Sequence, residues 1–399
     1  MAIDNKDKKI LNVPHLRFPE FSGEWEMVSL QDIATINPKS DPLQNTFIYI
    51  DLEAVEKGEL RKIQEIMREE APSRAQRVID NNDILFQCVR PYQKNNYIHR
   101  ILNTSNQQWV ASTGYAQIRT TELPNYIYHL LNTDEFNRKV MVRCTGSSYP
   151  AINSEDLATI HLYYTPDKKE QLKISRLLDL LDKRIATQNK IIEDLKKLKS
   201  AISKQAFAQK PNGWNRLDTL FSKGKAGGTP TSTNKEYYNG EIPFLSINDI
   251  TKQGKYVRYT ENHLSRSGLE NSSAWVVPEY SLIISMYASV GLVTINEVPI
   301  TTSQAMFAMQ LRDKDLLDYL YYYLSYFKYR HIHKYLETGT QSNINADIVR
   351  GIMIPTYGHS RNMKIASTLQ GIDAKIDNEL SVLKLFNRQK NYLLSQMFI

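Results

Sequence analysis

Residues 170–207 read EQLKISRLLDLLDKRIATQNKIIEDLKKLKSAISKQAF, and residues 361–398 read RNMKIASTLQGIDAKIDNELSVLKLFNRQKNYLLSQMF. The two stretches align without a gap at an offset of 191 residues. Repeats of about 20 to 50 residues are typical of solenoids, so this longer period indicates two copies of a whole domain, each followed by its own helix. Identical pairs include Lys173/Lys364, Ile174/Ile365, Leu178/Leu369, Asp182/Asp373, Ile185/Ile376, Gln205/Gln396 and Phe207/Phe398.

Both stretches carry apolar residues at spacings of three, four or seven, which is the a/d pattern of a coiled coil. Each helix would be about 35–40 residues long, or roughly 55–60 Å at 1.5 Å per residue. We expect the two helices to pack against each other in antiparallel orientation; the alternative is two unrelated amphipathic helices. The seam positions are Ile174, Leu178, Leu181, Ile185, Ile192, Leu195, Leu198 and Ile202, then Ile365, Leu369, Ile372, Ile376, Leu380, Leu383, Phe386 and Leu393.

The segments before the two helices read as mixed α/β modules, with short β-rich runs separated by Asn-, Gly- and Pro-containing turns. The predicted fold class is therefore α+β: two mixed α/β domains and two long antiparallel helices, related by a pseudo-twofold internal repeat. Predicted strands lie at 47–50, 84–86, 160–164, 243–247, 282–286 and 351–355, and predicted helices at 125–143 and 314–336. The expected divisions are a disordered lead-in (1–13), a first α/β domain (14–165), a central helix (166–210), a second α/β domain (211–357) and a C-terminal helix (358–399).

Composition limits the classes of function. The 399 residues carry a net charge of +7 and 24 Tyr against 12 Phe, many of them among polar residues, which suits hydrogen-bonded surfaces for protein or nucleic acid. Cys88 and Cys144 are too few for a disulfide framework. The N-terminus has no apolar segment of signal-peptide length, and no run approaches 18 apolar residues. We expect a cytoplasmic protein without a membrane span.

The motifs of catalysis are missing. Residues 224–228 (GKAGG) have the wrong order for a phosphate loop, and no Asn-Pro-Pro-aromatic tetrapeptide is present to hold a base for amino methylation. His331 and His333 lack Cys or Asp partners at ligand spacing. Asp194-Leu195-Lys196 matches a nuclease fragment, but it lies in a Lys-rich helical run. The sequence therefore predicts a binding protein with no catalytic or metal site.

Two sets of loops have the composition of a DNA-recognition surface. In the first module, APSRAQR (71–77) and VRPYQKNN (89–96) carry the Arg, Asn and Gln side chains that pair with guanine and adenine edges. In the second, GGTPT (227–231) precedes YYNGEIPFL (237–245), and its glycines would allow close approach to a partner. Each loop alone is also compatible with an ordinary surface turn. The candidate DNA-binding residues are Ser73, Arg74, Arg77, Arg90, Tyr92, Gln93, Lys94, Asn95, Asn96, Gly227, Gly228, Thr229, Thr231, Tyr237, Asn248, Tyr287, Ser289 and Gln304.

These motifs carry a family resemblance that spans nearly the whole chain. GGTPT…YYNGEIPFLSINDI, APSRAQRVI…DILFQCVRPY and Pro166-x-x-x-Glu170-Gln171 before a long helix resemble the specificity subunit of type I restriction–modification systems. The resemblance implies two domains, each reading one half of a split double-stranded DNA sequence. It also implies two methyltransferase (modification) subunits docked on the helices, and motor-nuclease (restriction) subunits. S-adenosylmethionine, ATP and Mg would then belong to the partners, with no cofactor on this chain.

The second copy departs from the first. It has Arg361-Asn362 where the first has Glu170-Gln171, and Gln389 opposite Leu198, so the two helices need not bind partners equally. The two modules also differ outside the repeat signatures, which points to an asymmetric target. Two other classes stay open: an autonomous restriction–methylation polypeptide, which would methylate DNA by itself, and a scaffold whose Tyr-rich modules bind proteins, which would bind DNA only weakly.

The duplicated layout predicts that the length of the central helix sets the distance between the two DNA half-sites. We predict that four residues inserted between Ile185 and Ile192 lengthen the spacer by about 6 Å, since each helical residue rises 1.5 Å. The seam turns by only about 40°, because 3.6 residues make a turn. Methylome mapping of a host carrying the variant should show both half-sites unchanged and the unread gap longer by one or two base pairs, at roughly 3.4 Å each. If the variant kept full activity and the gap between the half-sites stayed the same, the helix length would not set that gap.

Overall fold

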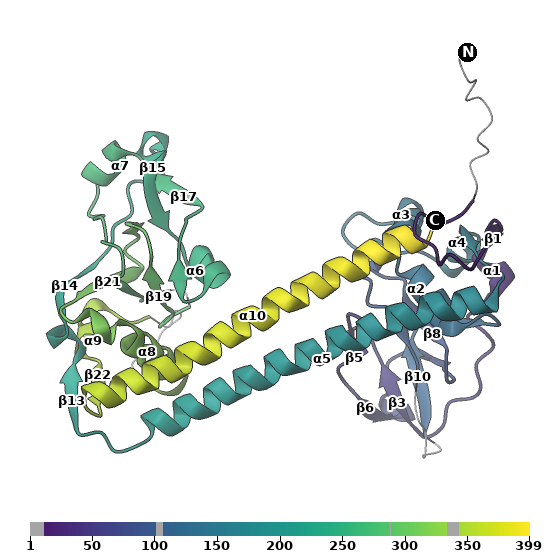
Figure 1. The fold of residues 1–399 in the computed structure, drawn as a ribbon, viewed down its shortest axis with the longest axis horizontal. Coiled ribbons are helices and arrows are strands. Elements are labelled where there is room, and N and C mark those ends of the chain that lie inside the picture. The colour runs from purple at the N-terminus through teal and green to yellow at the C-terminus, as the bar shows by residue number, and fades with distance from the viewer. Residues whose placement is uncertain (1–11, 101–106, 288, 333–342) are drawn as a thin grey trace, which may run out of the picture. The chain divides into compact units, whose positions relative to one another are not determined.

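The computed structural model in Figure 1 describes residues 12–100, 107–287, 289–332 and 343–399. Residues 1–11 of the expected lead-in lie outside the described residues. The chain forms two compact units: one runs up to Asn189 and takes in Ser381–Ile399, and the other is Lys190–Leu380. Each unit therefore contains one α/β domain and one half of each long helix. No helix in the described ranges is long and apolar enough to cross a membrane.

The first unit is built on two four-stranded sheets, ordered β6-β3-β10-β7 and β2-β11-β8-β9. Only β10 and β3 pair in parallel; the other ladders of these sheets are antiparallel. Two small pairs, β1-β12 and β4-β5, complete the unit. The strands are β1 (Glu26–Ser29), β2 (Ala34–Ile36), β3 (Thr46–Ile50), β4 (Val55–Glu56), β5 (Glu59–Leu60), β6 (Gln64–Met67), β7 (Ala75–Val78), β8 (Ile84–Gln87), β9 (Tyr97–Ile98), β10 (Gln108–Ser112), β11 (Tyr115–Thr120) and β12 (His161–Tyr164).

The helical stretch predicted at 125–143 is confirmed except for one break. Residues 125–143 form two helices, because the hydroxyl of Thr133 accepts a hydrogen bond from the Phe136 amide and so starts a new helix. The Asn132 amide bonds the carbonyl oxygens of His129 and Leu130, which ends the preceding helix. The short helices are α1 (Leu30–Ile33), α2 (Pro124–Leu131), α3 (Asp134–Arg143) and α4 (Ser154–Ala158).

The second unit repeats this plan with a five-stranded sheet, β14-β21-β18-β19-β16, and a three-stranded sheet, β17-β15-β20, beside the pair β13-β22. The predicted helix at 314–336 forms α8 up to Arg330, while residues 333–336 lie outside the described part of the chain. The elements are β13 (Gly213–Arg216), β14 (Phe221–Ala226), β15 (Tyr238–Leu245), β16 (Tyr256–Val257), β17 (Asn262–Leu264), β18 (Leu282–Ser285), β19 (Val293–Asn296), β20 (Thr301–Thr302), β21 (Met306–Leu311), β22 (Met353–Thr356), α6 (Ile247–Gln253), α7 (Arg266–Glu270), α8 (Leu317–Arg330) and α9 (Ala346–Gly351).

The repeat is visible in matching backbone hydrogen bonds of the two units. The Ile152 amide donates to the Cys88 carbonyl oxygen at 3.1 Å, and the Ile344 amide donates to that of Met286 at 3.1 Å. The Leu30 amide likewise bonds the Ile160 carbonyl oxygen at 3.0 Å, as Leu217 bonds Ile352 at 2.9 Å. The predicted duplication of a whole domain is therefore confirmed at the level of individual contacts.

The two long helices, α5 (Lys168–Phe207) and α10 (His359–Met397), pack together in antiparallel orientation (Figure 1). In the first unit, Lys390 Nζ lies 2.5 Å from a carboxylate oxygen of Asp182. In the second, Lys199 Nζ lies 2.6 Å from Asp373. Lys199 and Lys390 occupy the same repeat position, as do Asp182 and Asp373. The helices thus make the same ion pair twice with the partners exchanged, which is the signature of a twofold interface.

Most of the predicted seam faces inward, with Ile174, Leu178, Leu369 and Ile376 among its buried residues. Two positions are wrong. Leu198 is 47% exposed because Leu195, Lys199 and Ile202 take the inward face there, and a neighbouring residue points about 100° away. Leu380 is 42% exposed for the same reason, since the adjacent Glu379 is buried.

Each long helix ends inside an aromatic core. The Phe398 ring at the end of α10 packs on Trp25 and Tyr126 at centroid distances of 6.1 and 5.5 Å. The repeat counterpart Phe207, at the end of α5, packs on Tyr319 and Tyr323 at 6.0 and 5.3 Å. Each domain core is therefore completed by the end of a helix that begins in the other unit.

Glu170 fixes the start of α5. Its fully buried carboxylate accepts bonds from Nε and Nη2 of Arg17 at 2.7 and 2.9 Å and from the Thr165 hydroxyl at 2.7 Å. The pairing raises the pKa of Arg17, chiefly through this hydrogen bond. In the second copy Asn362 has a related role, since its side-chain oxygen accepts from the Tyr357 amide at 3.0 Å.

We predict that Arg17→Ala lowers the free energy of unfolding by about 3 kcal/mol, because it leaves the Glu170 carboxylate buried without its cation. Urea unfolding of the full chain measures the change. The exposed pair Arg216–Asp218 offers a control, and Arg216→Ala should leave stability nearly unchanged. Equal stability of Arg17→Ala and wild type would contradict a structural role for the buried pair.

Candidate nucleic-acid interface

Four loops of the first unit converge at one end of its two sheets, namely residues 72–77, 88–96, 112–114 and 145–151. Backbone bonds join them: the Thr113 amide donates to the Arg74 carbonyl oxygen (2.9 Å), Cys88 to Gly114 (3.0 Å) and Arg90 to Pro150 (2.7 Å). The structure thus brings both predicted recognition segments of this module together, with a third loop, 145–151, beside them.

These four loops are free of acidic residues. The four loops contain no Asp or Glu but carry Arg74, Arg77, Arg90 and Lys94. Arg90 has a left-handed backbone (φ 55°), and its guanidinium lies 4.2 Å from the centroid of the Tyr149 ring. An arginine held against an aromatic face is pre-organised for a planar partner, because stacking restricts the side chain and leaves its donors outward.

Arg77 is half-buried, and the described part of the chain gives it no counter-charge. Its Nε has no hydrogen-bond partner among the described residues, and burial lowers the pKa of its guanidinium. The neighbouring Cys88 thiol supplies no negative charge, since burial raises its pKa to about 12. A buried cation is costly unless it is paired, so an anion or hydrogen-bond acceptor from a ligand would complete this site.

Several predicted residues are held by their own domain. Lys94 pairs with Asp134 at 2.6 Å, and Asn95 accepts from the Lys57 amide at 3.0 Å. Asn96 is buried; its side-chain oxygen accepts from the Gln87 amide, and its amide donates to Asn132. The side-chain oxygen of Gln93 accepts from Gln87, which leaves Ser73, Arg74 and Tyr92 as the exposed members without such a bond.

The second unit brings a different set together at the equivalent place. The Gly227 amide donates to the Met306 carbonyl oxygen at 3.1 Å, and the Met286 amide to Ala305 at 2.7 Å. The Thr229 hydroxyl bonds the side-chain oxygen of Gln304. These bonds place Thr229, Gln304 and exposed Tyr287 on adjoining loops. Thr231 is also exposed on the loop of Thr229, and Ser289 on the loop of Tyr287. Tyr237 and Asn248 belong instead to the part around β15, where Asn248 donates to Glu261 at 3.0 Å.

The two glycines of GGTPT are explained by packing within the domain. A Cβ on Gly227 would lie 2.0 Å from the Thr302 carbonyl oxygen, and one on Gly228 would lie 2.4 Å from the Ala274 amide nitrogen. Both glycines are buried. The sequence explained them by close approach of a partner, whereas the structure uses them for close approach of the domain's own backbone.

Two features of these surfaces were missed from the sequence. Tyr149 is 63% exposed and supports Arg90, although it is not among the candidate DNA-binding residues. The Nζ atom of Lys223, on β14, lies 4.3 Å from the centroid of the Trp275 ring, and sequence spacing alone does not reveal this contact. Among the described residues, no three His, Cys, Asp or Glu side chains gather as a metal site would require.

Comparisons with known proteins agree with this arrangement. The chain is 22% identical over 380 residues to the HindI specificity subunit of a type I restriction enzyme from Haemophilus influenzae, covering 75% of this chain and 78% of that protein. A solved chain from a study of assembly and conformational transition of the type I R-M system has a TM-score of 0.60 at 21% identity, covering 94% of this chain and 97% of that one. The S subunit of the M. genitalium type I system has a TM-score of 0.59 at 14% identity, over 97% and 99%.

The decisive match is to the family model. The type I restriction modification DNA specificity domain matches residues 22–197 and a second time residues 211–384. The two matches coincide with the two copies of the internal repeat and together span most of the 399 residues. This chain belongs to the type I restriction modification DNA specificity family.

Proposed function

We propose that this chain is the non-catalytic DNA-specificity subunit of a type I restriction–modification complex and acts in the cytoplasm on double-stranded DNA. Each α/β domain reads one half of a bipartite sequence. The observation that carries this proposal is the set of four acid-free loops in the first unit, where Arg74, Arg77 and Arg90 converge and Arg77 has no counter-charge among the described residues.

The two half-sites are unlike each other. The first surface is rich in guanidinium groups, which pair bidentately with guanine, whereas the second offers Thr229, Tyr287 and Gln304. Glutamine pairs bidentately with adenine, and its bond to Thr229 restricts the Gln304 side chain. The target is therefore asymmetric, with a guanine read by the first domain and an adenine read by the second.

Two methyltransferase subunits dock on the long helices. Leu180, Ile191 and Leu198 are 64%, 39% and 47% exposed on α5, and their spacing of eleven and seven residues keeps them on one face. Leu385 and Tyr392, seven apart on α10, are 60% and 59% exposed. Such rows of exposed apolar side chains are typical of protein contact surfaces. The exposed residues of α5 and those of α10 do not occupy equivalent positions of the repeat, so the two partner sites differ.

The chemistry lies on the partner subunits. S-adenosylmethionine binds the methyltransferase subunits, and ATP and Mg act with the motor-nuclease subunits, while this chain binds no cofactor. The competing class, an autonomous methylating polypeptide, predicts methyl transfer by the purified chain alone. A protein-binding scaffold predicts DNA affinity no greater than that of any basic protein.

We predict that Arg90→Ala relaxes base choice at one position of the first half-site, at a cost of about 1–3 kcal/mol in discrimination. Arg138→Ala, which removes an exposed arginine from α3, is the matched control and should leave the site unchanged. Methylome mapping of hosts carrying each variant measures both effects. The assignment is wrong if the Arg90 variant keeps full specificity, or if the second half-site changes instead.

A further inference from the structure

A basic cleft of about 350 Å³ lies in the second unit between α5 and α8. Five residues of α5, from Lys196 to Lys204, and five of α8, from Tyr322 to Arg330, line it. Both sets follow the i, i+3, i+4, i+7, i+8 spacing of a single helix face. The cleft is thus a groove between two helix faces about 12 Å long, at 1.5 Å per residue.

The groove carries an excess of positive charge. Its cations are Lys196, Lys199, Lys204 and Arg330, and its one carboxylate is Asp373. Asp373 is already bound by Lys199 at 2.6 Å and by the Tyr322 hydroxyl at 2.8 Å. Within the described ranges, Lys196, Lys204 and Arg330 are exposed and have no ion-pair partner. Three cations therefore point into one groove with nothing from the described chain to neutralise them.

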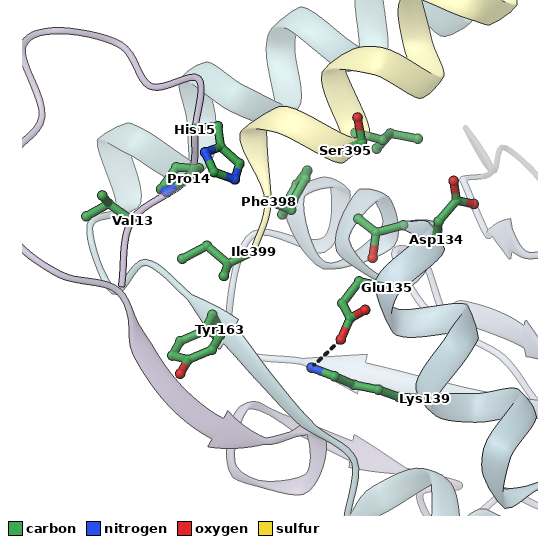
Figure 2. Close-up of a pocket in the computed structure, with 12 residues that line it drawn as sticks. Val13, Pro14, His15, Asp134, Glu135, Lys139, Tyr163, Ser395, Phe398 and Ile399 are labelled. Atoms are coloured by element: carbon green, nitrogen blue, oxygen red, sulfur yellow. Dashed lines mark ion pairs between the residues drawn. The ribbon is translucent and has the colours of Figure 1, made fainter. Parts of the chain in front are cut away.

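The first unit has a cleft at the matching repeat position, with about 470 Å³ of space (Figure 2). Leu394 and Ser395 line it, and they are the counterparts of Ser203 and Lys204, 191 residues earlier. Thr133 in the same cleft corresponds to Tyr326 when buried Tyr126 is aligned with buried Tyr319. The two clefts therefore share three repeat positions of their linings.

The two clefts differ in charge. The first-unit cleft has Asp134 and Glu135 on one wall with Lys139, which pairs with Glu135 at 3.4 Å, and has apolar Phe398 and Ile399 on another (Figure 2). Asp134 is paired with Lys94, and Glu135 with Arg138 and Lys139. Among the described residues, the excess of unpaired cations is therefore a feature of the second-unit groove and not of the first-unit cleft.

We propose that the basic groove binds backbone phosphates of double-stranded DNA without reading its sequence. This inference rests on the proposed function, because DNA is the polyanion that the recognition domains would bring to the chain. Lysine acts as a point charge toward phosphate, and exposed Tyr329 adds a hydroxyl donor of the kind that contacts phosphate oxygens. A groove of this length spans about three phosphates of one strand, spaced roughly 3.4 Å along the axis.

The test compares Lys196→Ala/Lys204→Ala with Lys183→Ala/Lys190→Ala in the full chain. The control pair removes the same charge from exposed positions of the same helix outside the groove. Fluorescence anisotropy follows binding of two duplexes, one with the recognition sequence found by methylome mapping and one unrelated. The groove variant should bind both duplexes more weakly by the same factor, and its salt slope should fall by about two, because each phosphate contact contributes roughly one. Lys196→Arg/Lys204→Arg should restore the slope.

Three results would overturn the proposal. Equal effects of the groove and control pairs would mean that only net charge matters. A loss confined to the mapped sequence would mean that the groove reads bases. Unchanged DNA binding with impaired assembly with methyltransferase subunits would make it a protein-docking site. Failure of the wild-type chain to prefer the mapped duplex when it is assembled with methyltransferase subunits would instead count against the proposed function, so the two failures are distinguishable.

Discussion

The structure depends on a reciprocal contact between its two long helices. Lys390 pairs with Asp182 and Lys199 pairs with Asp373, at repeat positions that exchange roles. The helix ends follow the same rule, since Phe398 fills the core around Trp25 and Tyr126, and Phe207 fills the core around Tyr319. Burying a phenylalanine contributes about 1.5–3 kcal/mol, so each domain draws part of its stability from a helix that begins in the other unit. Duplication of domain and helix together is what allows this exchange.

The two copies share a frame of strands and helices, and they differ in the side chains of the loops on it. The backbone bonds Ile152–Cys88 and Ile344–Met286 place equivalent loops at the ends of equivalent strands. On that common frame the first copy carries arginines and the second carries Thr229 and Gln304. Backbone hydrogen bonds do not depend on side-chain identity, so the loops can carry different residues while the strands and helices below them stay in place. A shared frame with unlike surfaces is what an asymmetric target requires.

The sequence predicted the frame better than the surface. Helical spacing of apolar residues located both long helices, and the β-rich run at 84–86 lies in β8. Both predictions succeed because buried residues recur with the period of the helix or strand that carries them. The errors occurred where one local hydrogen bond, or the exact rotation of a helix about its axis, decides. Thr133 breaks a helix through a local cap, and Leu198 turns outward because its neighbours face inward. Among the candidate DNA contacts, composition cannot distinguish Asn96, which is buried against Gln87 and Asn132, from exposed Tyr92.

A separate phosphate-binding groove would change how the recognition loops share their work. Affinity for DNA comes mainly from phosphates, whereas discrimination comes from base edges. If the loops alone supplied both, each change of base preference would also alter affinity, because arginine serves both purposes. Cations on α5 and α8 are outside the loops, so they contribute the same binding energy to every sequence. The loop side chains of the second unit, such as Gln304, can then change without loss of that unit's contact with the DNA backbone.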